Sequence, residues 1–353
     1  MLFILLIYLI VVAIIFVAGL VLSGSLRTKG HIARALNMSL FLITLPRDPS
    51  TGSGQGQQRT EKELISVTEQ LYSSFSNIHS RGWNKFIYGE PYISLEMAVH
   101  HVGEEIFFYI AVPKTYEQVF EKQVHGFFPT AEVEKVKDYN IFNPDGVSLG
   151  AYVKLSKNPI LPFKTYQNLQ ADPLSEIATS LSKLEKEGEG AAVQILIRPS
   201  HRDDLRKIAQ KTAREIQSGY KFLEALSRAK HSPKKSDQET RDKRQEAPRI
   251  VTPFDEEIIK GIQSKATKPL FDTNIRVVVS AGNEMRAKQL LGDIEGSFVQ
   301  FTASDMNGLK TVKISAGALK KLLFNFSFRL FDNSQSTLLS SEEITSLYHF
   351  PMA

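Results

Sequence analysis

The chain begins with an uninterrupted apolar run, Met1–Leu22, that carries no charged side chain. A helix rises about 1.5 Å per residue, so roughly 20 apolar residues span the hydrocarbon of a bilayer. A buried core helix is normally shorter than this run. A cleaved signal peptide would have a basic segment before a shorter apolar core and small residues at its cleavage site, and Val21-Leu22-Ser23 fits that poorly. The run therefore predicts a retained, single-pass transmembrane anchor at residues 1–22.

Basic residues flank this run on one side only. Arg27, Lys29 and Arg34 follow it, whereas only the terminal amine precedes it. By the positive-inside rule, the N-terminus faces outward and the rest of the chain lies in the cytoplasm. The lack of cysteine agrees with a reducing compartment. We therefore expect a membrane-tethered cytoplasmic protein whose first partner is the lipid bilayer.

The composition after the anchor is that of a globular protein. Apolar residues make up 42% of the chain, including 22 Phe and 11 Tyr, so a sizeable core can form. The roughly 330 remaining residues suffice for about two domains. Residues 23–60 fit a juxtamembrane strand, Met38–Leu45, followed by a flexible linker rich in Gly, Ser and Gln. The first domain is expected to begin at Glu61.

The order of predicted elements occurs twice in the remaining sequence. Residues 61–170 are expected to contain a helix at 61–78, a hairpin of strands at 93–102 and 105–112, a helix at 116–127 and a strand at 131–136. Residues 171–335 are expected to contain a helix at 173–187, strands at 191–198 and 274–280, a helix at 283–291 and a strand at 296–302. The repeat predicts an α+β fold in which the N-terminal transmembrane helix is followed by two ferredoxin-like α+β units, each an antiparallel sheet with helices on one face.

The second unit carries an insertion at residues 200–271. Apolar residues recur at helical spacing over residues 201–230, which predicts a long helical arm, and residues 231–249 have too few apolar side chains to stay folded. The arm and its tip hold 14 Lys and Arg against 8 Asp and Glu, an excess larger than the +5 of the whole chain. Such a surface fits nucleic-acid phosphate or anionic lipid, or it is a solvated helix face. The candidate contacts are Lys207, Lys211, Arg214, Lys221, Arg228, Lys230, Lys234, Lys235, Arg241, Lys243 and Arg244.

No catalytic, cofactor or metal constellation is predicted. The segment around Ser148, Gly-Val-Ser-Leu-Gly, matches a nucleophile elbow, but an elbow needs a helix after its serine and a β-like segment follows here. His100 and His101 would point to opposite faces of a strand and lack further ligands. The Gly-rich stretch at 52–56 lacks the Lys-Ser/Thr of a phosphate-binding loop, and the sequence has no Walker motif. We therefore expect a non-enzymatic chain without a cofactor.

The last segment, residues 336–353, carries the most specific motif. A helix-capping pattern begins at Ser340, and the sequence EEITSLYHFP follows at Glu342–Pro351. This motif resembles an element of conjugation and type IV secretion ATPases of the FtsK–HerA superfamily. There, "EE-[LI]-x-x-L-[YW]-H-[FL]-P" ends an α+β N-terminal region just before the motor domain. The predicted anchor and α+β units are similar to that region too, but the printed sequence ends where the motor would begin. The resemblance implies a hinge helix that joins or contacts a motor through Glu342, Glu343, Leu347, Tyr348, His349 and Pro351.

Together these features predict an assembly or docking domain of a conjugation-like machine that translocates DNA or protein. The chain would be a single-pass protein of the bacterial inner membrane, would form homo-oligomers and would bind the ATPase of the machine. The alternative is a membrane-tethered nucleic-acid-binding protein that contacts DNA through the basic insertion. Salt-sensitive DNA binding that depends on the arm would favour this alternative.

Overall fold

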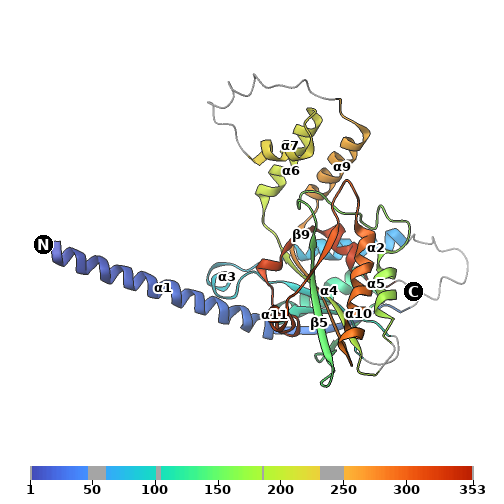
Figure 1. The fold of residues 1–353 in the computed structure, drawn as a ribbon, viewed down its shortest axis with the longest axis horizontal. Helices are drawn as coiled ribbons and strands as arrows, with labels where there is room; N and C mark the ends of the chain where they lie inside the picture. The colour runs from blue at the N-terminus through green and yellow to red at the C-terminus, as the bar shows by residue number, and fades with distance from the viewer. Residues whose placement is uncertain (1, 47–60, 101–104, 185–186, 231–249, 352–353) are drawn as a thin grey trace, which may run out of the picture.

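The computed structural model describes residues 2–46, 61–100, 105–184, 187–230 and 250–351. Within these ranges the chain forms an α+β fold around a nine-stranded sheet whose strand pairings are all antiparallel. A long helix, α1 (Leu2–Leu36), leaves this body on one side, and a group of helices projects from it elsewhere (Figure 1). The α+β class expected from the sequence is confirmed.

The bounds of the elements follow the predicted ones closely in most of the sheet. The strands are β1 Met38–Thr44, β2 Ile93–Val99, β3 Phe107–Pro113, β4 Glu132–Val136, β5 Val147–Leu155, β6 Gly190–Pro199, β7 Leu270–Ala281, β8 Leu309–Lys313 and β9 Thr337–Ser340. The helices that pack on or near the sheet are α2 Glu61–Phe75, α3 Gly82–Tyr88, α4 Glu117–Phe127, α5 Pro173–Leu181, α10 Glu284–Ser297, α11 Ala316–Ser327 and α12 Ser341–Leu347.

The sheet consists of two halves with the same internal order. Its strand order is β4-β1-β3-β2-β6-β7-β5-β8, and β9 pairs with one end of β7. The first half is β4-β1-β3-β2, and the second half, taken from the opposite edge, is β8-β5-β7-β6. Each half has a helix after its first strand (α2 or α5) and another after its third (α4 or α10). The halves join where β2 pairs with β6.

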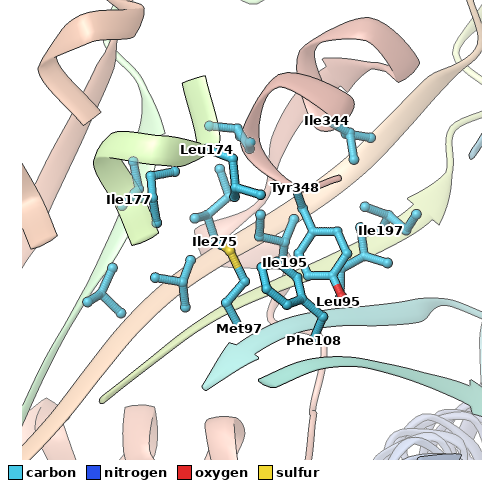
Figure 2. Packing of buried hydrophobic residues seen from close by; sticks show 14 of the residues in the cluster. Leu95, Met97, Phe108, Leu174, Ile177, Ile195, Ile197, Ile275, Ile344 and Tyr348 are labelled. Carbon is cyan, nitrogen blue, oxygen red and sulfur yellow. The ribbon is translucent and has the colours of Figure 1, made fainter. Parts of the chain in front are cut away.

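One face of the sheet carries the main hydrophobic core. Side chains such as Leu95, Ile195 and Ile275 point from neighbouring strands toward α5 and α12, where they meet Ile177 and Tyr348 (Figure 2). The central strand β7 is buried along its whole length, because structure covers both of its faces. That double coverage explains why β6, apart from Gln194 and Arg198, and the Val277–Val279 part of β7 lack the polar alternation of a half-exposed strand.

The opposite face carries a buried row of polar side chains. The strand register places Glu96 of β2 beside Gln194 of β6, and Gln194 beside Arg276 of β7. Helix α11 ends above this row. Arg276 donates to the carbonyl of Asn325 and Gln194 donates to the carbonyl of Phe326, so side chains of the sheet add hydrogen bonds to two carbonyls of the last helical turn, which also accept from the backbone N–H groups of Leu330 and Arg329.

An ion pair lies at the Glu96 end of the same row. Arg329, just after α11, lies 2.8 Å from Glu96 through its Nε, and the Glu96 side chain is fully buried. Burial alone would raise the pKa of the Glu96 carboxyl, but Arg329 holds this pKa below its ordinary value. Burial lowers the pKa of the Arg276 guanidinium to about 10. The row therefore fixes α11 on the sheet through charge and hydrogen bonds as well as apolar packing.

Three local predictions need correction. Residues 296–302, predicted as a strand, are the end of α10 and a 3-10 turn, Phe298–Phe301, and the edge strand of this half is β8 instead. A short apolar run is compatible with a strand or with a helix, and its packing in the fold determines which of the two forms. The strand at Met38–Leu45, assigned to a juxtamembrane segment, is β1 inside the sheet, between β4 and β3. Helix α1 does not end with the apolar run at Leu22 but continues to Leu36.

Among the residues that the structure describes, no helix is both long and apolar enough to cross a membrane.

Candidate functional site: a helical arm and the cavity at its base

Three helices between β6 and β7 form an arm that projects from the body (Figure 1). They are α6 Asp203–Gln217, α7 Phe222–Lys230 and α9 Pro253–Thr267. Their apolar faces form a core separate from the main one, and two residues of the body, Ile160 and Leu161, complete it at the base. The arm residues of this core are Ala209, Ala213, Ile216, Ala225, Leu226, Ile258, Ile259, Ile262 and Ala266.

The predicted single helix over residues 201–230 is in fact two helices. Gly219 adopts a φ of +92°, a conformation that side chains with a Cβ rarely tolerate, and it turns the chain between α6 and α7. The guanidinium of Arg228 then stacks on the ring of Tyr220 at 3.8 Å and pairs with Glu215 at 3.0 Å. The turn therefore folds the arm back on itself, and Arg228 serves to hold it closed.

The other predicted contacts that the structure describes in this region are exposed. Lys207, Lys211 and Arg214 are exposed and follow one another at i, i+4 and i+7, which places them on one face of α6. Lys221 and Lys230 are exposed as well. Within the described residues, none of these five side chains lies within ion-pair distance of a carboxylate. The other predicted contacts, Lys234, Lys235, Arg241, Lys243 and Arg244, lie outside the described residues.

A cavity of about 350 Å³ opens at the base of the arm. It lies between α9, the start of α12 and the loop at residues 162–168, and five of its fourteen lining residues are charged. The charged lining residues are Glu257, Lys260, Lys265, Glu342 and Glu343.

The deepest of these groups form a buried ion pair. Lys265 of α9 and Glu343 of α12 are 4% and 0% exposed, with Nζ 2.8 Å from Oε2. Lys265 also donates to the carbonyl of Leu338, and Glu343 accepts from the backbone N–H groups of Phe163 and Ser340. Burial lowers the pKa of the Lys265 ammonium, and Glu343 offsets part of that effect. Both charges of this pair therefore have partners inside the chain. The pair fixes α9, at the base of the arm, to β9 and α12.

A second, more exposed cluster continues this junction. Lys268 pairs with Glu342 and, at 2.7 Å, with Glu69 of α2. Burial opposes the charge on Lys268, but its hydrogen bonds to Glu342 and Glu69 raise the pKa of its ammonium. The end of α9 is thus tied to α12 and α2 together.

The structure places the residues of the resemblance motif inside the molecule. Ser340 and Glu343 form the predicted capping box, so the expected helix start is confirmed. Leu347, Tyr348 and His349 are fully buried. The Tyr348 hydroxyl donates to the carbonyl of Tyr109, and Nε2 of His349 lies 3.0 Å from Asp172. Of the six predicted motor contacts, Pro351 is exposed. The motif therefore forms part of the core of this chain, and its contact with a motor stays a prediction.

The structure also shows the neighbours of Ser148 and His100, which were considered from the sequence as a nucleophile and a metal ligand. Ser148 lies in β5, as expected, and its hydroxyl contacts that of Ser280 at 3.2 Å. The His100 ring lies 2.8 Å from the Tyr109 hydroxyl, and His101 lies outside the described residues. In the part of the chain that the structure describes, no group of three or more His, Cys, Asp or Glu could hold a metal ion.

Sequence reasoning missed Lys265 and its role at the base of the arm. The position carried a usable signal, because Lys265 falls on the apolar stripe of α9 with Ile258 and Ile262. A lysine on a buried stripe needs a carboxylate partner. The sequence alone did not identify Glu343 as that partner, since the two residues are distant in the chain.

Comparison with known proteins places the chain in a family. Residues 56–353 match a domain of unknown function, DUF8128, and the chain belongs to this family. No curated protein matches the chain.

Proposed function

We propose that this protein is a membrane-anchored, non-catalytic docking protein of a machine that translocates DNA or protein, similar to those of conjugation and type IV secretion. Helix α1 is the anchor in the bacterial inner membrane, the sheet is the scaffold on the cytoplasmic side, and the arm is the docking element. Its partners are further copies of itself and the ATPase of the machine. The resemblance of Glu342–Pro351 to the hinge of such ATPases supports the choice of machine.

The surface of α1 is the observation that carries this proposal. The helix extends away from the body (Figure 1), and its large apolar side chains are exposed along the first 22 residues wherever they are described. They include Leu6, Tyr8, Leu9, Val12, Ile14, Ile15, Phe16, Val17, Val21 and Leu22, at 44–68% exposure. Soluble monomers rarely expose an apolar surface of this extent. Lipid covers all sides of such a helix at once, whereas a protein partner covers one side.

The two halves of the sheet fit the scaffold role. Each half has the element order strand, helix, strand, strand, helix, strand and the sheet order 4-1-3-2 of a ferredoxin-like unit. We therefore include two ferredoxin-like units in the proposal, joined edge to edge through β2 and β6. The arm is then an insertion between the second and third strands of the second unit, in a connection that does not interrupt the sheet.

Arginine in the middle of the apolar run is expected to release the protein from membranes. Val12→Arg with Ile15→Arg costs about 2.5–3.5 kcal/mol for each charge at the centre of a bilayer. The intact chain should stay in the membrane pellet after alkaline carbonate extraction, and the double variant should move to the supernatant. Leu36→Arg is the matched control, because Leu36 is equally exposed on α1 but lies beyond the apolar run. Extraction of the intact chain by carbonate would contradict the anchor.

A second function, binding of nucleic acid by the arm, is favoured by the exposed row on α6. Lys207, Lys211 and Arg214 lie on one helix face without a carboxylate partner among the described residues. Phosphates of DNA, about 1.7 Å apart along the axis of a duplex, suit such a row. In this reading α1 still anchors the protein, and the arm holds DNA beside the membrane.

Charge reversal on this row is expected to weaken DNA binding and to reduce its salt dependence. Lys207→Glu, Lys211→Glu and Arg214→Glu together remove three phosphate contacts, so the slope of log K against log salt should fall by about 3. Fluorescence anisotropy of a labelled duplex over a salt series measures this slope. The control is Lys310→Glu, Lys313→Glu and Lys320→Glu, which makes the same change in net charge at exposed positions of β8 and α11. Equal loss in both triple variants, or binding that does not depend on salt, would rule out a DNA site on the arm.

A further inference from the structure

A short helix beside α1 presents aromatic side chains to solvent. Helix α3 has no buried residue. Trp83 is 78% exposed, and it meets Phe86 edge to face with 5.9 Å between the ring centroids. Tyr88 is 39% exposed on the same helix. Large apolar side chains that gather on a surface usually mark a contact with another molecule or with lipid.

The position of α3 is fixed against α1. A Cβ at Gly30 would lie 2.1 Å from the carbonyl oxygen of Ile87, so only glycine lets the backbone of α3 approach this closely. Arg34 then bridges both ends of the α3 segment, donating to the carbonyl of Gly89 at 2.7 Å and to the hydroxyl of Ser80 at 3.0 Å. In Figure 1, α3 lies alongside α1 on the side of the body from which α1 extends. The aromatic side chains are therefore held at a defined distance from the apolar run.

That distance brings α3 to the surface of a bilayer spanned by α1. Gly30 lies about 12 Å along the helix axis beyond Leu22, at roughly 1.5 Å per residue. The polar headgroup layer is about 5–8 Å thick on each side of the hydrocarbon, and a helix with its side chains is about 10–12 Å wide. The side of α3 that faces the apolar run therefore reaches the headgroups.

The chemistry of α3 suits the same place. Tryptophan and tyrosine concentrate at the boundary between hydrocarbon and water, where the ring is apolar and its N–H or O–H stays hydrated. Lys29 of α1, Arg81 and Lys85 are exposed, α3 contains no acidic residue, and Lys85 pairs at 2.6 Å with Glu90, which follows α3. Basic side chains near a membrane surface are attracted to anionic headgroups.

We infer that α3 is an interfacial element that lies in the anionic headgroup layer of the bilayer that α1 spans, with Trp83 inserted at the edge of the hydrocarbon. This inference rests on the proposed anchor. It gives the body a fixed orientation on the membrane, because α1 alone would leave the body free to tilt about a single helix. The arm, which extends from another part of the body, would then keep a constant direction relative to the membrane (Figure 1).

Trp83 is the only tryptophan of the chain, so its fluorescence tests the inference directly. The intact protein is reconstituted in vesicles of phosphatidylcholine with phosphatidylglycerol, and in the same vesicles with brominated acyl chains. We expect a blue-shifted emission, loss of most of the emission in brominated lipid, and protection from aqueous iodide. Vesicles of phosphatidylcholine alone should give weaker lipid quenching. Flotation of the same samples reports separately whether the anchor holds.

Two variants serve as controls. Trp83→Phe with Met285→Trp moves the fluorescent probe to α10, where Met285 is 81% exposed. Figure 1 shows α10 on the side of the body away from α1. Brominated lipid should therefore not quench this tryptophan. Gly30→Val forces α3 off α1 and should lower the lipid quenching of Trp83 without changing flotation. Protein that floats, but whose Trp83 is quenched by iodide and not by brominated lipid, would overturn the inference and leave the anchor intact. A blue shift without lipid quenching would assign α3 to a protein contact and overturn it as well. Failure to float would overturn the anchor itself.

Discussion

A chain that ends at Ser336 is expected not to fold, because β9 and α12 complete the main core. Ile344, Leu347, Tyr348 and Phe350 are each at most 1% exposed. Burial of a large apolar side chain contributes about 1.5–3 kcal/mol, so the four contribute roughly 6–12 kcal/mol. That is comparable with the whole stability of a typical domain, about 5–15 kcal/mol. In detergent, the shortened chain should show no cooperative thermal transition by circular dichroism and should be digested rapidly by protease.

Point variants separate this effect from simple shortening. Tyr348→Ala should cost about 3–5 kcal/mol, as removal of a buried aromatic ring usually does. Tyr348→Phe keeps the ring and loses only the hydrogen bond to the Tyr109 carbonyl, so about 1 kcal/mol is expected. Pro351→Ala changes an exposed residue of the same segment and should stay within about 0.5 kcal/mol. A chain ending at Ser336 that melts like the intact protein would show that β9 and α12 are peripheral.

The buried position of this segment changes how a motor contact has to be tested. If an ATPase failed to co-purify with a chain lacking β9 and α12, the cause would be unfolding rather than a lost contact. Glu343, Leu347, Tyr348 and His349 have no surface to offer in the folded chain. Substitution of exposed residues, such as Pro351 or those of the arm, is the informative experiment.

Local patterns were sufficient to predict most elements of the sheet. Short runs rich in apolar and β-branched residues predicted β2, β3 and β6, and the structure has a strand at each of these places. The capping pattern at Ser340 predicted the start of α12, because a cap depends on residues only three positions apart. Repeated element order, without residue identity, led to the expectation of two similar halves.

Features that depend on distant residues were not predictable in the same way. The sequence of β6 gives no reason for Gln194 in a buried strand until α11, more than a hundred residues later, supplies the Phe326 carbonyl. Glu96 likewise depends on Arg329. The basic residues of α6 were identified because surface charge is visible in sequence, whereas the Lys265–Glu343 pair at the base of the arm needed the fold.

Breaking the Lys265–Glu343 pair is expected to be the most damaging single change at the base of the arm. Removal of one partner from a buried pair usually costs about 3–5 kcal/mol, because the other charge is left without compensation. Lys265→Met leaves Glu343 with the two backbone N–H groups of Phe163 and Ser340 and should fall at the lower end. Glu343→Gln leaves a buried ammonium and should fall at the higher end. Thermal and chemical unfolding of the full chain in detergent measures both.

The double variant and the pH dependence show whether the charges themselves are responsible. Lys265→Met with Glu343→Gln leaves no buried charge, so it should cost less than the sum of the single changes, by about 0.5–3 kcal/mol. In Glu343→Gln the offsetting carboxylate is gone, so the pKa of Lys265, already lowered by burial, should fall further below its ordinary value. The unfolded state then binds more protons than the folded state above this lowered pKa, and the stability of the variant should rise as pH increases toward the ordinary lysine pKa. Exposed Lys288→Met, which breaks the surface pair with Glu284, is the matched control and should change little at any pH. If the costs of the single changes were additive and the stability of Glu343→Gln did not vary with pH, packing rather than the ion pair would hold the arm to β9 and α12.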